Sequence, residues 1–235
     1  MTGYDRDRFG AAWLDADRNG CDTRNDILTR DLMQRVYDPD THGCVVLSGT
    51  LADPYTNQRI AFVRGDGDLV DIDHVVALGN AWVTGAFQWE IRKRAAFAND
   101  PMNLLAVDAS ANRQKGDGDS ATWLPKNKAY RCDYVARQIG VKAKYRLWVT
   151  APERDAMARV LAACPDEPQV PDSGAPVVAP LRLSDPSGSP TPESGGAGAY
   201  GNCDEARAAG AAPVRRGDPG YSTGLDGDGD GVACE

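Results

Sequence analysis

The chain has 235 residues, of which 42% are hydrophobic, and it carries a formal net charge of -8 at neutral pH. This length accommodates one well-cored domain with an appendage, and the sequence lacks the run of about eighteen apolar residues that a membrane helix needs. The acidic balance argues against a general nucleic-acid-binding protein.

The charge is spread unevenly along the chain. Between residues 86 and 150, twelve Lys and Arg stand against six Asp and Glu, a local balance of +6. A basic segment in an acidic chain is typical of a phosphate-binding face. The same charges also fit the solvated faces of ordinary helices, and both interpretations stay open from charge alone.

The six cysteines are even in number, and none forms the Cys-x-x-Cys pair typical of zinc sites. We interpret them as three disulfides, which indicates an oxidising, extracellular setting. The alternative is six reduced, buried thiols in a cytosolic protein. Fifteen pairings are possible, and proximity along the chain favours Cys21 with Cys44, Cys132 with Cys164, and Cys203 with Cys234. The N-terminus shows no basic segment followed by an apolar one, so no signal peptide is visible.

Residues 4 to 38 are predicted to be helical with an interruption. Two helical faces support this, one of Phe9, Trp13 and Leu14 and one of Ile27, Leu28, Leu32 and Val36. Between them, Asp15, Asp17 and Asn19 precede Gly20, as at the opening of a calcium loop, with Asp26 at the twelfth position where Glu is usual. An ordinary turn rich in Asp, Asn and Gly explains the same residues.

Two apolar runs, 45–47 and 60–63, flank a turn-like segment and predict a β-hairpin. Residues 70–76 then place Asp73 and His74 among β-branched residues, a pattern typical of a buried strand. The ordinary explanation is that Asp73 and His74 are buried polar residues whose hydrogen bonds are satisfied within the core. Functionally, a carboxylate and an imidazole at one strand end provide a metal ligand and a base.

The elements after this strand follow the order helical insertion, strand, helix. Residues 77–98 are Ala-rich and predict helices, and an apolar run after Asn103 predicts a second strand. Ser110 is the expected N-cap of the helix that carries Asn112. Without the insertion, the order is strand, strand, helix.

The remaining sequence predicts two helices, a linker and a small module. Residues 127–139 form the first helix, closed by Gly140, and a capping box from Thr150 to Glu153 opens the second. Residues 165–199 contain eight prolines and no aromatic residue, which predicts a disordered or semi-extended linker. The final stretch, 200–235, is too short to be stabilised by a hydrophobic core alone, so it needs a cross-link such as a disulfide.

Three segments resemble the parts of the HNH, or ββα-metal, endonuclease motif, and in particular its secreted members. They are Asp73-His74-Val75-Val76, Asn103-Leu104-Leu105 and Ala111-Asn112-Arg113-Gln114-Lys115. The resemblance implies an α+β fold, with a ββα-metal core embedded in helices over residues 1–164. The linker 165–199 would follow, and then the module 200–235, stapled by a disulfide and calcium.

The resemblance also implies a role for each residue. His74 would be the general base, held by Asn103, which would accept its other ring proton. Asp73 and Asn112 would hold one Mg²⁺ or Mn²⁺ ion. Some members carry His in place of Asn112, which affects the preferred metal. Arg113 and Lys115, at the helix start, are candidate phosphate contacts.

The tail resembles the Excalibur calcium-binding module, through Asn202-Cys203 and the run from Asp226 to Glu235. This implies that Asp226, Asp228, Asp230 and Glu235 bind Ca²⁺, whereas a solvated acidic tail is the alternative.

The expected function is therefore that of an extracellular or cell-surface endonuclease, monomeric and without a membrane span, acting on nucleic acid, with DNA favoured. The rival is a calcium-dependent surface- or matrix-binding protein with a catalytically silent HNH core.

Overall fold

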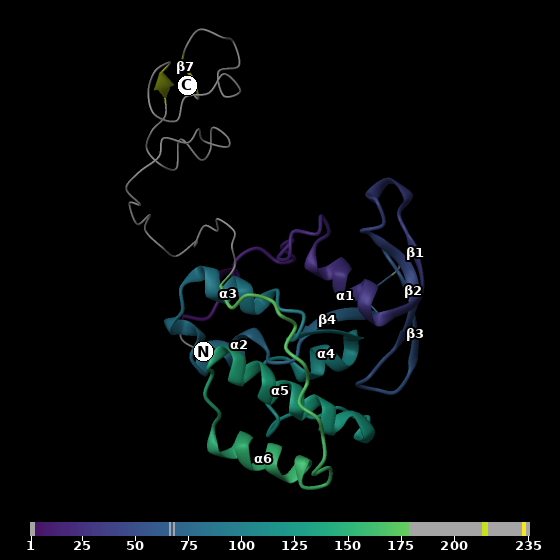
Figure 1. Ribbon diagram of the computed structural model, residues 1–235, viewed down its shortest axis with the longest axis vertical. Helices are drawn as coiled ribbons and strands as arrows, with labels where there is room; N and C mark the ends of the chain where they lie inside the picture. The colour runs from purple at the N-terminus through teal and green to yellow at the C-terminus, as the bar shows by residue number, and fades with distance from the viewer. Residues whose placement is uncertain (1–2, 66, 68, 179–212, 216–231, 234–235) are drawn as a thin grey trace. The chain divides into compact units, whose positions relative to one another are not determined.

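A computed structural model describes residues 3–65, 67, 69–178, 213–215 and 232–233 (Figure 1). The chain divides into two compact units, residues 1–188 and residues 189–235. Helices and strands are mixed in the first unit, as expected for the α+β class.

The N-terminal part of the first unit is a three-stranded antiparallel sheet with a helix against it. Its elements are η1 (Arg6–Phe9), α1 (Thr23–Asp31), β1 (Leu32–Tyr37), η2 (Pro39–Thr41), β2 (Val46–Ala52) and β3 (Arg59–Val63), with the strand order β1-β2-β3. The hairpin β2–β3 is confirmed. The helical prediction for Leu32 and Val36 is wrong, because Leu32 pairs with Leu51 of β2 and strand pairing overrides helical spacing.

The ββα order is present in the middle of the chain. Strands β4 (Val70–His74) and β5 (Leu104–Asp108) pair antiparallel, with His74 opposite Leu104, and helix α4 (Ala109–Lys115) follows directly. The helix begins earlier than predicted, because the side chain of Asp108 rather than Ser110 caps it by accepting from Ala111 N–H at 2.7 Å. The predicted insertion forms α2 (Leu78–Val83), η3 (Ala86–Gln88) and α3 (Ile91–Ala98).

Three helical elements follow the ββα unit: η4 (Lys128–Tyr130), α5 (Arg131–Tyr145) and α6 (Ala151–Leu161). Helix α5 continues through Gly140, which was expected to end it. A Cβ atom at this position would overlap the side chain of Met102, so the glycine serves close packing rather than termination. The predicted cap of α6 is confirmed, since Thr150 accepts from Glu153 N–H at 3.3 Å.

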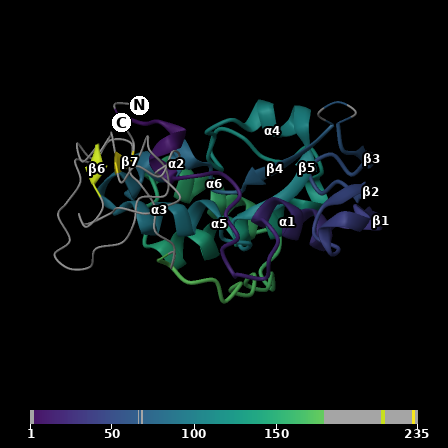
Figure 2. The same ribbon diagram turned by 90° about the horizontal axis from the view of Figure 1, so that it is seen from above.

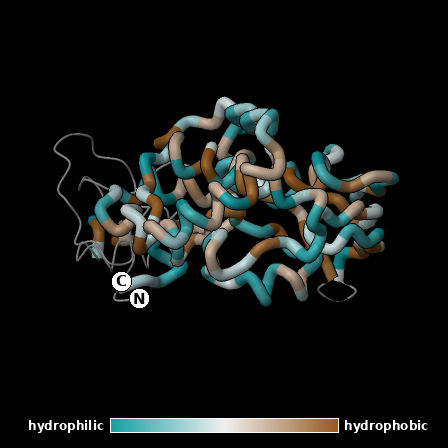
Figure 3. Tube along the Cα trace, turned by 90° about the horizontal axis from the view of Figure 1, so that it is seen from below, coloured by the Kyte–Doolittle hydropathy of each residue, from teal (hydrophilic) through white to brown (hydrophobic). Residues whose placement is uncertain are grey.

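The ribbon β4–β5 is covered on both faces, as Figure 2 shows with α4 on one side. One face contributes Leu105 and Val107 to a core shared with α4, α5 and α6. The other face contributes Ile72, Leu104 and Ala106 to a core shared with α1 and the three-stranded sheet. Figure 3 shows the hydrophobic stretches running through the middle of this unit. Burial on both faces fixes the register of the ribbon, since a slip of one residue would exchange its faces.

Two disulfides match the predicted pairing of neighbours along the chain. Cys21 bonds Cys44 and Cys132 bonds Cys164, with Cα–Cα distances of 5.1 and 6.5 Å. The first joins the segment before α1 to that before β2, and the second joins the start of α5 to the segment just after α6. The predicted pair Cys203 and Cys234 lies outside the described residues.

Part of the predicted linker is tied to the first unit. Residues 165–178 contain no helix or strand, yet Val170 packs against a hydrophobic core. Asp172 pairs with Lys144 at 2.5 Å, and the Ser173 hydroxyl donates to Asp100 at 2.5 Å. These residues are therefore ordered by contacts that their composition does not reveal.

In the second unit, strands β6 (Val214–Arg215) and β7 (Val232–Ala233) pair antiparallel. The predicted calcium ligands Asp226, Asp228, Asp230 and Glu235 lie outside the described residues. Within the described ranges, none of the helices has the length and apolar character required to cross a membrane.

Candidate active site

A cavity of about 140 Å³ opens at the end of β4 and brings together three of the predicted site residues. It is lined by Tyr4, Arg6, Ile72, Asp73, His74, Ala77, Leu78, Asn112, Gly116 and Asp117. Asp73 and His74 come from β4 and Asn112 from α4. Direct packing of α4 against β4 and β5 therefore places the proposed base and both proposed metal ligands at one cavity.

His74 is 7% exposed, and its Nε2 lies 2.9 Å from the carbonyl oxygen of Ala98. A carbonyl only accepts, so Nε2 carries the proton and Nδ1 is the free basic nitrogen. Burial, with smaller contributions from the charges of Arg6 and Lys115, lowers the pKa of His74 to about 3, although the Ala98 carbonyl opposes the shift. The imidazole is thus neutral at neutral pH and able to accept a proton, but its low pKa makes it a weaker base than a histidine that titrates near neutral pH. The indole of Trp13 stacks beside it at 6.3 Å between ring centroids.

Asp73 is 4% exposed, and both of its oxygens have partners. Lys115 Nζ donates to Oδ1 at 2.8 Å and the Tyr55 hydroxyl donates to Oδ2 at 2.5 Å. Burial raises the pKa of Asp73, while Lys115 and Tyr55 oppose the increase by stabilising the carboxylate. The pair with Lys115 thus compensates for part of the cost of burying a charged carboxylate.

Asn112 is anchored by Asp71, to which its Nδ2 donates at 3.1 Å. This contact assigns the amide nitrogen to Asp71, so the amide oxygen is available to the cavity. Across the cavity, Asp117 accepts from Gly79 N–H at 3.1 Å. A Cβ atom at Gly79 would overlap the Asp117 carboxylate, so this close approach requires glycine.

Asn103 differs from its expected contact. It is fully buried and bridges to the backbone of Val76, accepting from the N–H at 2.8 Å and donating to the carbonyl at 3.3 Å. The Ala98 carbonyl, rather than Asn103, takes the ring proton of His74. Asn103 therefore fixes the backbone that leaves β4 next to His74.

The expected phosphate contacts also differ in position. Arg113 and Lys115 lie in the last turn of α4, not at its N-terminus. Lys115 is 3% exposed, and its Nζ is bound to Asp73 and, at 2.8 Å, to the His74 carbonyl. Lys115 therefore supports the site from within, and Arg113 remains exposed.

The basic segment does not form one continuous cationic face. Besides Lys115, Arg94 is buried, and Lys142 is in a buried pair with Glu153 at 2.6 Å. Lys144 pairs with Asp100 at 2.8 Å. Part of the local excess of positive charge is therefore used inside the fold.

The residues at the cavity fit a hard divalent cation. Asp73 and Asn112 offer oxygen ligands of the kind Mg²⁺ and Mn²⁺ prefer, and each Asp73 oxygen has a lone pair beyond its one hydrogen bond. In the described ranges, the one group of three His, Cys, Asp or Glu ligand atoms within 4.8 Å is Cys132, Cys164 and Glu167. Its sulfurs form the disulfide, so the cavity is the better candidate, with two protein ligands and room for water.

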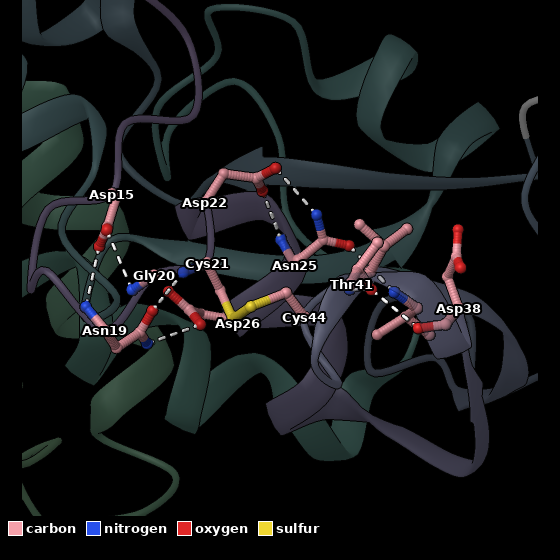
Figure 4. Close-up of a disulfide and its surroundings, with 12 residues drawn as sticks. Asp15, Asn19, Gly20, Cys21, Asp22, Asn25, Asp26, Asp38, Thr41 and Cys44 are labelled. Carbon is pink, nitrogen blue, oxygen red and sulfur yellow. Dashed lines mark hydrogen bonds between the residues drawn. A yellow bond between two sulfur atoms is a disulfide. The ribbon is translucent and has the colours of Figure 1, made fainter.

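The calcium-like loop near the N-terminus is saturated by its own polar groups (Figure 4). Asp15 accepts from the backbone of Asn19 and Gly20, each at 3.0 Å, and Asn19 Nδ2 donates to Asp26 at 3.0 Å. Asp15, Asp17 and Asp26 do not bring three ligand oxygens within 4.8 Å of one another. The arrangement favours an ordinary turn held beside the Cys21–Cys44 disulfide.

Three residues at the site were missed by sequence reasoning: Arg6, Tyr55 and Asp117. Tyr55 reaches Asp73 from the tip of the β2–β3 hairpin, and its position in a turn gave no hint of this. No role was predicted for Asp117, which follows the matched segment by two residues. That spacing from Lys115 was the one available signal.

Comparisons with known proteins identify two domains in the chain. Residues 22–160 match the family model of GmrSD restriction endonucleases, C-terminal domain, and residues 200–235 match the Excalibur calcium-binding domain. A protein of Arthroderma benhamiae, named an uncharacterized secreted protein, is 38% identical over 166 residues, which cover 70% of this chain and 77% of the relative. The comparison with solved structures gave no match. Both domain matches point to bound cations, a divalent metal in the first domain and calcium in the second.

Proposed function

The chain belongs to the family of the GmrSD restriction endonuclease C-terminal domain, and from this premise we propose that it is a secreted, metal-dependent HNH endonuclease. The observation that carries the proposal is the single cavity lined by Asp73, His74 and Asn112. These residues supply a base and two oxygen ligands at one place, the set that metal-assisted phosphodiester hydrolysis needs.

Asp73 and Asn112 would hold the divalent ion, Mg²⁺ or Mn²⁺. When bound, such an ion polarises a phosphoryl oxygen and stabilises the leaving 3′ oxygen. The chain prepares both ligands: Tyr55 and Lys115 orient the Asp73 carboxylate, and Asp71 orients the Asn112 amide.

His74 would take the proton from the attacking water at Nδ1. Its Nε2 proton stays with the Ala98 carbonyl, which fixes both tautomer and ring orientation. Trp13 covers the ring from one side, and Asn103 holds the adjoining backbone. Each of these contacts reduces the reorganisation needed before proton transfer.

Independent observations support a secreted location. Two disulfides are present, and structural disulfides persist in oxidising compartments. The relative from Arthroderma benhamiae carries the word secreted in its name. The substrate would then be extracellular nucleic acid, with DNA favoured.

For the second unit we propose calcium binding by Asp226, Asp228, Asp230 and Glu235, supported by the Excalibur match over residues 200–235. Three alternating carboxylates repel one another unless a cation bridges them. Calorimetry of the full chain should show calcium binding that disappears in Asp228→Ala and persists in Asp15→Ala. Unchanged binding in Asp228→Ala would place the calcium site elsewhere.

One observation favours the rival, a calcium-dependent surface-binding protein with a silent core. Lys115 holds Asp73 at the distance of a direct ion pair, and a metal would share that carboxylate with an ammonium group. In a surface-binding protein with a silent core, Asp73 would stay paired with Lys115 and no metal would bind there.

A plasmid-nicking assay decides between the two. The wild type with Mg²⁺ or Mn²⁺ should nick supercoiled DNA, and His74→Asn should lose this activity by at least about a hundredfold, the scale of general-base catalysis. The matched control is His42→Asn, because His42 is exposed in a turn with a positive φ of 52° that Asn tolerates. No nicking by the wild type, or equal nicking by His74→Asn, would refute the enzyme.

A further inference from the structure

The short helical turn η1 is anchored beside the candidate cavity. Phe9 is 1% exposed and packs against Trp82 and Phe97, with ring centroids 6.4 and 6.0 Å apart. Its N-cap Asp5 accepts from Asp7 N–H at 2.9 Å. These contacts hold the backbone around Arg6 in place, although η1 precedes the family match, which begins at residue 22.

Arg6 lines two neighbouring cavities, and His74 lines both of them as well. One is the cavity of Asp73 and Asn112, and the other is a small space of about 10 Å³ near Trp13 and Ala98. The side chain of Arg6 is exposed. Within the described ranges it makes no hydrogen bond or ion pair, so its guanidinium is free to bind a ligand.

The charge balance of the larger cavity makes this arginine important. Two carboxylates, Asp73 and Asp117, line it, and Arg6 is the one cationic side chain in that lining. Lys115 is buried and already paired with Asp73. A phosphodiester approaching these carboxylates meets repulsion unless a cation of the protein assists the metal ion. A guanidinium suits this task because its fork matches two phosphate oxygens.

We propose that Arg6 binds a phosphate group of the nucleic-acid substrate at the cavity of Asp73, His74 and Asn112. This inference rests on the proposed function and extends it to a segment outside the family match. The N-terminal turn then belongs to the substrate-binding site. Phe9 holds the turn against the core, and Arg6 contacts the phosphate group.

The kinetic test compares Arg6→Ala, Arg6→Lys and the control Arg92→Ala in the nicking assay. Arg92 is an exposed arginine of α3 that lines neither cavity. Loss of a charge-assisted contact should lower kcat/KM about 10- to 100-fold in Arg6→Ala. Arg6→Lys should recover part of it, because the charge stays and the fork is lost. Equal activity of Arg6→Ala and Arg92→Ala would overturn the proposal.

A second readout needs neither metal nor turnover. Binding of a fluorescent DNA duplex in EDTA should weaken in Arg6→Ala, and the salt dependence of log K should decrease by about 0.9 for the one lost phosphate contact. A merely structural role would lower the melting temperature or kcat and leave this slope unchanged, which would overturn the proposal.

The two readouts also separate this inference from the proposed function. A wild type that nicks DNA, with Arg6→Ala unaffected in both assays, leaves the nuclease standing and refutes the role of Arg6. A wild type that fails to nick refutes the nuclease, and the metal-free binding assay still decides whether Arg6 contacts phosphate.

Discussion

Two acid-rich clusters in the first unit contain similar residues and differ in what surrounds them. In the loop from Asp15 to Asp26, the carboxylates are half-buried or exposed and accept from groups of the same short segment. At the end of β4, Asp73 is buried, and its partners Tyr55 and Lys115 lie 18 and 42 residues away along the chain.

We expect this difference to distinguish a structural cluster from a reactive one. A loop that satisfies its acids locally forms a stable turn and needs no ligand. A buried acid beside a cavity requires support from several distant elements, and that cost is typical of functional sites. Asp73 meets this description, and Asp15 does not.

The largest contrast is expected for matched removal of one carboxylate charge from each cluster. Asp73→Asn should lower nicking at least about a hundredfold, because a metal ligand supplies several kcal/mol of transition-state stabilisation. Asp15→Asn should stay within about twofold of the wild type in the same assay, since no step of the reaction uses it. Similar losses in both variants would remove the distinction between the clusters.

The next contrast concerns ion pairs, measured as the free energy of unfolding in urea. Lys115→Met leaves Asp73 buried without its cation and should cost about 3–5 kcal/mol. Arg154→Ala breaks the exposed pair with Asp155, where the side chains are 70% and 54% exposed, and should cost less than about 1 kcal/mol. A loss below 1 kcal/mol in Lys115→Met would mean that Asp73 is neutral or solvated in the fold.

A smaller contrast compares one asparagine from each region. Asn103→Ala leaves the backbone of Val76 without its buried partners and should destabilise the protein by about 1–3 kcal/mol. Asn19→Ala removes exposed hydrogen bonds, including that to Asp26, and should cost less than about 1 kcal/mol. Calorimetric thermal unfolding of the wild type and both variants gives the two losses of stability. If Asn19→Ala destabilised the protein more than Asn103→Ala, the turn would contribute more to the stability of the fold than its exposure indicates.

Local patterns predicted much of this molecule. The β2–β3 hairpin, the ββα order, the cap at Thr150 and two disulfides between neighbouring cysteines all depend on short-range signals such as alternation, turn residues and spacing. Asp73, His74 and Asn112 converge because β4 pairs with β5 across the helical insertion and α4, which follows β5 directly, packs against both strands.

The errors arose where tertiary contacts decide the outcome. Leu32 continued a helical spacing but pairs with Leu51 of β2, and Gly140 resembled a helix end but faces Met102. Lys115 was expected to contact phosphate at the start of a helix and is instead a buried partner of Asp73. No pattern within a single segment reports such contacts, which join residues far apart in the chain.

We propose that the cavity of Asp73, His74 and Asn112 hydrolyses phosphodiesters with the 3′ oxygen as leaving group. The most direct measurement is end analysis of a DNA duplex cleaved in Mg²⁺ or Mn²⁺ by the wild type and by His74→Asn. We predict products with 5′-phosphate and 3′-hydroxyl ends from the wild type and almost no product from the variant. Products with 3′-phosphate ends, or equal cleavage by both proteins, would rule out this reaction at the cavity.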